Sequence, residues 1–212
     1  MADTRAAGPG QAAPPVKAED AAWVSLPTPF TAAELTEFCR NIEWLYRINP
    51  YFEFLRWQNT APNCFHAEFR NLSNAQDVVT DLTLEEDSGG DLVVHYAQGI
   101  KKRTVFTIAP AAGGSTLTIT DDYTGMSEQE KRERLDEVDK SLTAWGTSLK
   151  AFLRRYKRWS WIAPWRWYMR RVWMNMKPSA RRITWLVILI TLVEFCFFLF
   201  VALIWWLEHL NR

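Results

Sequence analysis

Residues 135–156 read LDEVDKSLTAWGTSLKAFLRRY, and their apolar side chains recur mostly at intervals of three and four residues. This spacing predicts a long amphipathic helix whose apolar stripe covers one face of a sheet. Ser127 and Glu130 form a capping box that places its start. Gly146 is a weak position, because glycine in a helix costs about 1 kcal/mol relative to alanine. The stripe consists of Leu135, Val138, Leu142, Trp145, Leu149, Phe152, Leu153 and Tyr156.

The sequence before this helix predicts an antiparallel sheet. Short runs rich in aromatic and β-branched residues are separated by turn-forming clusters. Apolar and polar residues alternate in several of them, as in strands with one buried face. The connections, such as Gly99 to Lys102, are short enough for hairpins. The runs are 51–57, 64–72, 78–84, 92–97, 104–108 and 117–123.

The N-terminal part adds a strand and a helical segment. Residues 21–30 read as a strand that lies at an edge, because Pro27 and Pro29 cannot donate sheet hydrogen bonds. Thr31 and Glu34 form a capping box for a helical segment that ends at Asn49-Pro50. Residues 1–20 are rich in Ala, Pro and Gly and lack the apolar core of a secretory signal, so we expect them to be disordered.

The order of these elements resembles the START-like or helix-grip (SRPBCC) superfamily, which includes polyketide cyclases and lipid-transport proteins. The likeness covers residues 21–159 and rests on FTAAELTEFCRNIEWLYRINP (30–50), on the strands through Tyr123 and on the long helix 128–159. It implies an α+β helix-grip fold. A curved antiparallel sheet of about seven strands would wrap around the long C-terminal helix.

The resemblance also implies a cavity between sheet and helix for a lipophilic molecule such as a lipid, an isoprenoid or a quinone; no other cofactor is evident. The alternative is that the same side chains fill a dry core, which needs the same residue types. The predicted lining consists of Phe52, Phe54, Phe65, Phe69, Val78, Leu82, Val94, Tyr96, Phe106, Ile108, Leu142, Trp145, Leu149 and Phe152.

Catalytic and metal-binding patterns are weak. His66, Glu68 and Arg70 share one face of a strand, and His95 lies on another strand. His66 and Glu68 could form an acid/base pair, although a solvent-facing strand of alternating charge looks identical. The sequence has no metal-ligand spacing, hydrolase motif or phosphate-binding loop, and its three cysteines lack the spacing of a disulfide framework or zinc site.

Residues 183–207 read ITWLVILITLVEFCFFLFVALIWWL and predict a single transmembrane helix. At 1.5 Å per residue the segment is about 37 Å long, against roughly 30 Å of bilayer hydrocarbon. Trp185 near its start and Trp205 with Trp206 near its end fit the two aromatic belts. Residues 208–212 form a short tail beyond the span.

Charge is distributed unevenly along the chain. Residues 1–139 carry 12 Lys/Arg and 22 Asp/Glu, whereas residues 140–182 carry 12 Lys/Arg and no acidic residue. Because positive flanking residues stay inside, we expect a single-pass protein of the cell (inner) membrane with its soluble domain in the cytoplasm and its C-terminus outside.

Residues 160–182 are basic and rich in tryptophan, which is typical of a helix that lies in a membrane interface. Anionic lipids are the expected partner. Nucleic acid is the alternative for such a composition, but a membrane span follows within a few residues and disfavours it. The predicted interface consists of Trp161, Trp165, Arg166, Arg170, Arg171, Trp173, Lys177, Arg181 and Arg182.

Glu194 is the only charged residue within 183–207 and lies near the middle of the predicted span. A carboxylate at that depth either is protonated or has a partner. Thr191 lies on the same helical face and could share the contact. Glu194 could therefore dock the span against another membrane subunit, or it could simply be tolerated in its protonated form.

Three functions follow in order of preference. The first is a non-enzymatic, membrane-anchored START-like domain that binds or carries a lipophilic ligand, with the basic segment holding the cavity mouth against the bilayer. The second is an accessory subunit of a larger membrane complex, with the cavity packed shut. The third is an enzyme of the cyclase type.

Overall fold

The computed structural model describes residues 21–124 and 128–210, and within the second range it describes side chains from Ser141 onward. The expected disorder of residues 1–20, the cap at Ser127 and the side chains of Leu135 and Val138 lie outside the described residues. The chain divides into two compact units between Met174 and Asn175. Each unit is a separate body.

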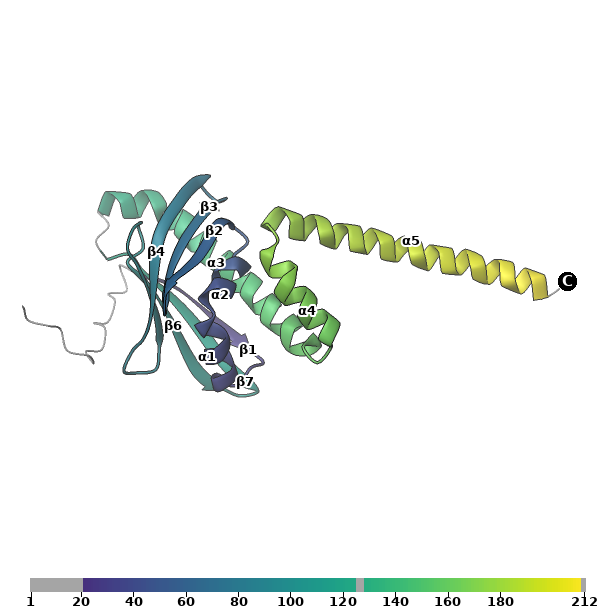
Figure 1. Ribbon diagram of the computed structural model, residues 1–212, viewed down its shortest axis with the longest axis horizontal. Coiled ribbons are helices and arrows are strands. Elements are labelled where there is room, and N and C mark those ends of the chain that lie inside the picture. Colours follow the sequence, from purple (N-terminus) through teal and green to yellow (C-terminus); the bar gives the residue numbers. More distant parts are fainter. Residues whose placement is uncertain (1–20, 125–127, 211–212) are drawn as a thin grey trace, which may run out of the picture. The chain divides into compact units, whose positions relative to one another are not determined.

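A seven-stranded antiparallel sheet forms the framework of the first unit (Figure 1). Each predicted run is a strand, and consecutive runs pair as the short connections indicated. Residues 21–28 pair with the last strand, so this proline-containing strand is an edge, as predicted. In spatial order the strands are β1 (Ala21–Thr28), β7 (Gly114–Asp122), β6 (Arg103–Ala111), β5 (Leu92–Tyr96), β4 (Gln76–Glu86), β3 (Cys64–Asn71) and β2 (Phe52–Ala61).

Two short helices, α1 (Ala32–Arg40) and α2 (Ile42–Ile48), connect β1 to β2. The predicted capping box begins α1: the backbone N–H of Glu34 donates to the Thr31 hydroxyl, and the backbone N–H of Thr31 donates to the Glu34 carboxylate. Cys39 on α1 is fully buried, and burial raises the pKa of its thiol to about 12. That thiol therefore stays protonated and acts as a small apolar side chain.

The long helix α3 (Glu128–Trp159) packs against the concave face of the curved sheet (Figure 1). Trp145, Leu149 and Leu153 are at most 1 % exposed. Alternation along the strands supplies the other half of the core, because inward residues such as Leu82 are buried while Asp81 beside it is exposed. The predicted α+β helix-grip fold is confirmed.

Gly146 lies where α3 approaches β1. A Cβ atom at this position would lie 2.9 Å and 3.1 Å from the two methyl carbons of Val24, and valine is stiff at χ1. The glycine that looked unfavourable for the helix is therefore required by packing.

Gly146→Ala tests this explanation. In an exposed helix this change would stabilise by about 1 kcal/mol. Here we expect overpacking to cancel that gain and lower the free energy of unfolding by about 1 kcal/mol in urea titrations. Adding Val24→Ala to Gly146→Ala should restore the stability lost to the clash. An unaltered or raised stability of the single variant would contradict the close approach.

Beyond α3 follow α4 (Ala163–Arg171), the 3-10 turn η2 (Trp173–Asn175) and α5 (Pro178–Leu210). In its most apolar window α5 has a mean hydropathy of 2.9 and no buried residue. By length and composition it can cross a membrane, and it contains the whole predicted span 183–207. Its helix continues to Leu210, so the first residues of the predicted tail are helical.

Candidate functional site

A pocket of about 310 Å³ opens at one end of the sheet, between the β3–β4 turn and the β5–β6 turn. A smaller pocket of about 60 Å³ adjoins it and reaches α3 at Ser141, Leu142 and Trp145. Both pockets are lined by Phe52, Asn71, Asn74, Ile100 and Lys101. We refer to the two together as the turn pocket.

The wall of the turn pocket is apolar on the sheet and polar at the rim. Phe69, Val78, Val79 and Tyr96 complete the sheet side of the larger pocket. The rim carries amide and charged side chains that the sequence reasoning did not select. These are Asn71, Asn74, Gln76, Asp77, Gln98 and Lys101.

The predicted cavity lining divides into two groups. Some of its members do line the turn pocket: Phe52, Phe69, Val78, Tyr96, Leu142 and Trp145. The others line neither part of it and either belong to the core or pack against it, so their place in a cavity wall stays a prediction. They are Phe54, Phe65, Leu82, Val94, Phe106, Ile108, Leu149 and Phe152.

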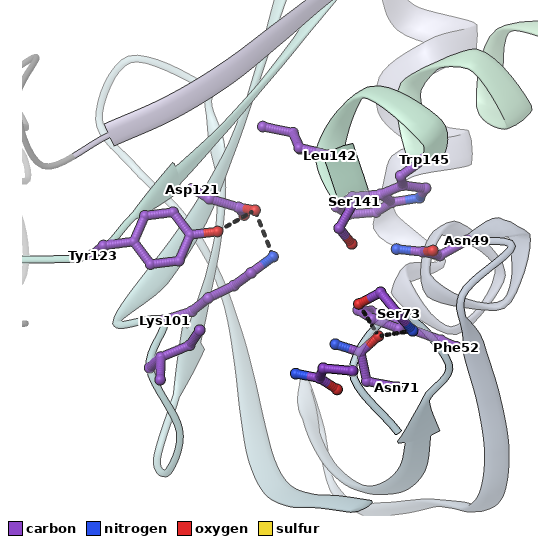
Figure 2. A pocket seen from close by; sticks show the side chains of 12 residues that line it. Asn49, Phe52, Asn71, Ser73, Lys101, Asp121, Tyr123, Ser141, Leu142 and Trp145 are labelled. Carbon is purple, nitrogen blue, oxygen red and sulfur yellow. Dashed lines mark hydrogen bonds and ion pairs between the residues drawn. The ribbon is translucent and has the colours of Figure 1, made fainter. Parts of the chain in front are cut away.

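Asp121 of β7 is the polar centre of the turn pocket and is only 1 % exposed. Its Oδ2 accepts hydrogen bonds from Lys101 Nζ at 2.5 Å and from the Tyr123 hydroxyl at 3.3 Å. Figure 2 shows Lys101 and Tyr123 reaching toward Asp121, opposite Ser141 and Trp145 of α3. A carboxylate buried this deeply requires such partners.

A chain of hydroxyl groups also ends on Asp121. The Thr104 hydroxyl donates to Asp121 Oδ1 at 2.6 Å, so the Tyr96 hydroxyl, 3.0 Å from Thr104, must donate to Thr104. Tyr46 must in turn donate to Tyr96, with which it forms a short hydrogen bond. Burial raises the pKa values of Tyr46 and Tyr96 well above the ordinary range, so both phenols stay protonated.

Lys101 is the one member of this network with donors to spare. Its ammonium has three N–H groups, and one donates to Asp121. The side chain is 21 % exposed and lines both parts of the turn pocket. Tyr96 also borders the pocket, but its hydroxyl proton is already donated to Thr104.

One sequence signal could have revealed this site. Leu117, Ile119 and Asp121 alternate in phase along β7, so a carboxylate occupies a position of the buried face. A charged residue in phase with the core needs a cation from elsewhere in the chain. Sequence alone does not indicate that Lys101 supplies it.

The predicted acid/base candidates lie on the other face of the sheet. His66 contacts Asp81 at 2.7 Å and Glu68 at 3.3 Å, while the inward residues of the same strand are Ala67 and Phe69. The carboxylates of Asp81 and then Glu68 accept hydrogen bonds from the protonated imidazole, and this raises the pKa of His66. His95 lies 3.5 Å from Glu85. Among the described side chains no cluster of His, Cys, Asp or Glu could hold a metal ion.

The predicted membrane-interface segment divides between two environments. Trp165 and Trp173 pack against the core of the first unit, with the Trp173 ring 5.2 Å from that of Phe152. The Arg170 guanidinium lies 5.9 Å above the Trp44 ring. In contrast, Trp161 is 76 % exposed. The basic residues Arg166, Arg171, Lys177 and Arg182 are exposed, and Arg181 is half-buried.

The docking of α4 bears on two expectations. The compact unit extends to Met174, with Met169 and Met174 buried in it, whereas the boundary of the START-like domain at Trp159 stays a prediction. No described residue of α4 lines the turn pocket. Ser141 at the pocket and Tyr156 beneath α4 are about 22 Å apart along α3, so α4 does not border the pocket mouth.

Glu194 and Thr191 both lie on α5 and are exposed along with the apolar residues around them. They stand three positions apart, on one face of the helix, as the sequence indicated. A contact between Glu194 and another membrane subunit stays a prediction.

No protein-family model matches the sequence, and no curated protein matches it. Solved structures resemble the fold. A START superfamily protein from Mycobacterium smegmatis has 14 % identity and a TM-score of 0.49 over 63 % of this chain and 96 % of its own. TTHA0849 from Thermus thermophilus has 13 % identity and a TM-score of 0.47 over 62 % of this chain and 97 % of its own.

A third solved structure is the di-domain ARO/CYC StfQ from the steffimycin biosynthetic pathway. It has 14 % identity and a TM-score of 0.48, over 63 % of this chain and 50 % of its own. The order of its strands and the long helix α3 give the chain the α+β helix-grip fold that the sequence predicts.

Proposed function

We propose that the protein is a membrane-tethered START-like domain that binds a lipophilic ligand in the turn pocket. The observation that carries the proposal is the pocket of about 310 Å³ with Phe52, Phe69 and Val78 in its wall. This volume is at the lower end of the range for small-molecule sites. It suits a ring system or a short isoprenoid segment and not a whole phospholipid.

Binding would be driven mainly by burial of apolar ligand surface, at roughly 25 cal/mol per Å². The polar rim would orient the ligand, because its amides and Lys101 can pair only with polar ligand atoms. The domain would act by shielding the ligand from water, with no chemical step. The two predicted acid/base candidates, His66 and His95, lie on the face opposite the turn pocket, which disfavours a cyclase-type reaction there.

The tether would be α5, inserted in the cell membrane with the first unit in the cytoplasm. The basic residues between 140 and 182 support this orientation. Exposed Trp161 and Trp167 would contribute interfacial contacts with anionic lipid, whereas Trp165 and Trp173 hold α4 to the domain.

Ligand capture can be tested by native mass spectrometry of the full chain released from detergent. We expect the purified protein to retain a lipophilic molecule and two filling variants to lose it: Val78→Trp in the wall and Ile100→Trp in the exposed β5–β6 turn. Ile100→Trp leaves the core untouched, so its effect cannot come from misfolding of the sheet.

Val105→Trp is the matched control, because it makes the same exchange on the outward face of β6. This variant should keep the bound molecule. Absence of any bound molecule in the wild-type chain, or equal retention by all variants, would contradict ligand capture and favour an accessory subunit with a closed domain.

A further inference from the structure

We infer that the turn pocket selects an uncharged lipophile that carries an acceptor oxygen, such as a ketone or quinone carbonyl, and that Lys101 donates to this oxygen. The inference rests on the proposed function and names the ligand class of the same site. It follows from the charge balance of the Lys101–Asp121 pair and from the direction of the hydrogen bonds around it.

Lys101 is the hydrogen-bond donor that a ligand meets in the turn pocket. Every hydroxyl in the chain Tyr46, Tyr96, Thr104 gives its proton toward Asp121, so Tyr96 offers the pocket no proton. Lys101 retains N–H groups beyond the one given to Asp121, and its side chain lines both parts of the pocket, at their junction. A ligand that reaches this junction therefore meets a donor and must present an acceptor.

The positive charge of Lys101 is paired with the negative charge of Asp121. Asp121 Oδ2 lies 2.5 Å from Lys101 Nζ, and its negative charge offsets most of the field of the ammonium in the pocket. A ligand anion would have to compete with Asp121 for Lys101, and success would leave a carboxylate that is 1 % exposed without its cation. Asp77 at the rim carries a further carboxylate, which is ion-paired with Arg70 at 4.0 Å, so the rim offers an anion no unpaired cation there. An uncharged carbonyl avoids both penalties.

Aromatic rings line the turn pocket close to Lys101. Phe52 lines both parts of the turn pocket, and its ring centroid lies 4.5 Å from that of Phe69. The Trp145 ring lies 5.9 Å from Lys101 Nζ, on the α3 side of the junction. Aromatic surface thus flanks the donor, which suits a flat conjugated carbonyl better than a saturated alcohol.

Three probes of similar size test the inference: butyrophenone, butylbenzene and 4-phenylbutanoate. The full chain in nanodiscs is titrated by calorimetry, with empty nanodiscs as the reference. We expect butyrophenone to bind at least about tenfold more tightly than butylbenzene, the effect of one hydrogen bond from a charged donor. The anion 4-phenylbutanoate should bind more weakly than the ketone.

Lys101→Met should remove the advantage of butyrophenone over butylbenzene and leave the binding of butylbenzene unchanged within about threefold. Lys102→Met is the matched control, since Lys102 is exposed, adjacent in sequence and absent from the pocket wall. Asp121→Asn should reverse the charge preference, because Lys101 would then face the pocket without its carboxylate. Thermal unfolding checks that each variant is folded.

The outcomes separate the two proposals. If no probe binds, the proposed function fails and the inference falls with it. If all three probes bind equally, or if Lys101→Met changes nothing, ligand binding stands and the assignment of Lys101 is wrong. Tightest binding of 4-phenylbutanoate to the wild-type chain would overturn the uncharged class.

Discussion

Trp145→Ala is expected to lower the free energy of unfolding of the first unit by about 3–5 kcal/mol. Trp145 is 1 % exposed, and its ring centroid lies 5.4 Å from that of Tyr46 and 6.0 Å from that of Phe106. Its indole N–H donates to the backbone carbonyl of Leu45 at 2.9 Å. Alanine would leave a cavity and an unpaired buried carbonyl between α3 and α2.

The measurement is a urea titration of the full chain in mild detergent, followed by near-ultraviolet circular dichroism. Trp23→Ala is the control, because Trp23 is 62 % exposed on the edge strand β1 and should change stability by no more than about 0.5 kcal/mol. A loss below about 1 kcal/mol for Trp145→Ala would show that α3 does not close the core as described.

Arg103→Met is the second substitution with a large expected effect, a loss of about 3–5 kcal/mol at neutral pH. Arg103 Nε donates to Asp122 Oδ2 at 2.8 Å, and the two side chains are 10 % and 3 % exposed. Removing the cation would leave Asp122 charged and buried. Arg103→Met combined with Asp122→Asn should recover part of the loss, whereas an equal loss in the double variant would contradict the pairing.

The pH dependence gives this pair a signature. Burial of Asp122 opposes ionisation, but hydrogen bonds from Thr124 and Arg103 outweigh it and lower the pKa of the carboxyl below its ordinary value of 3.8. Because the pKa of Asp122 is lower in the folded than in the unfolded protein, its ionised form stabilises the fold at pH values above the unfolded-state pKa. This stabilisation is lost as the pH falls below about 4. The difference between wild type and Arg103→Met should therefore shrink from pH 7 to pH 3. A constant difference would exclude a role for the charge of Asp122.

The elements of the fold follow from the sequence because each has a local cause. Alternation identifies the strands, the Thr31–Glu34 box begins α1, and the spacing from Leu142 to Tyr156 marks the buried stripe of α3. The pairing of β1 with β7 was not predicted, since no local signal joins strands so far apart in the chain.

The site was less predictable because pocket walls and core use the same residue types. Val78 and Leu82 share one face of β4, yet only Val78 borders the pocket. The difference depends on tertiary packing over each end of the strand, which the alternation along β4 does not determine. The Lys101–Asp121 pair joins the β5–β6 turn to β7 and has no local pattern.

The tryptophans of α4 and η2 illustrate a second limit of what sequence can predict. Trp165 and Trp173 belong to the basic, tryptophan-rich segment that the sequence predicts to lie in a membrane interface. A bilayer and a protein core cover such side chains equally well, because both exclude water. The structure shows that the core of the first unit covers Trp165 and Trp173.

The central claim, that the turn pocket holds a lipophile, is tested most directly by photolabelling. A diazirine-bearing aryl ketone is irradiated with the full chain in nanodiscs, and labelled peptides are mapped by mass spectrometry. The claim predicts labels on the peptides containing Phe52, Val78 and Ile100, suppressed by excess butyrophenone and by Val78→Trp. Labels confined to α5, or domain labels insensitive to both, would contradict it.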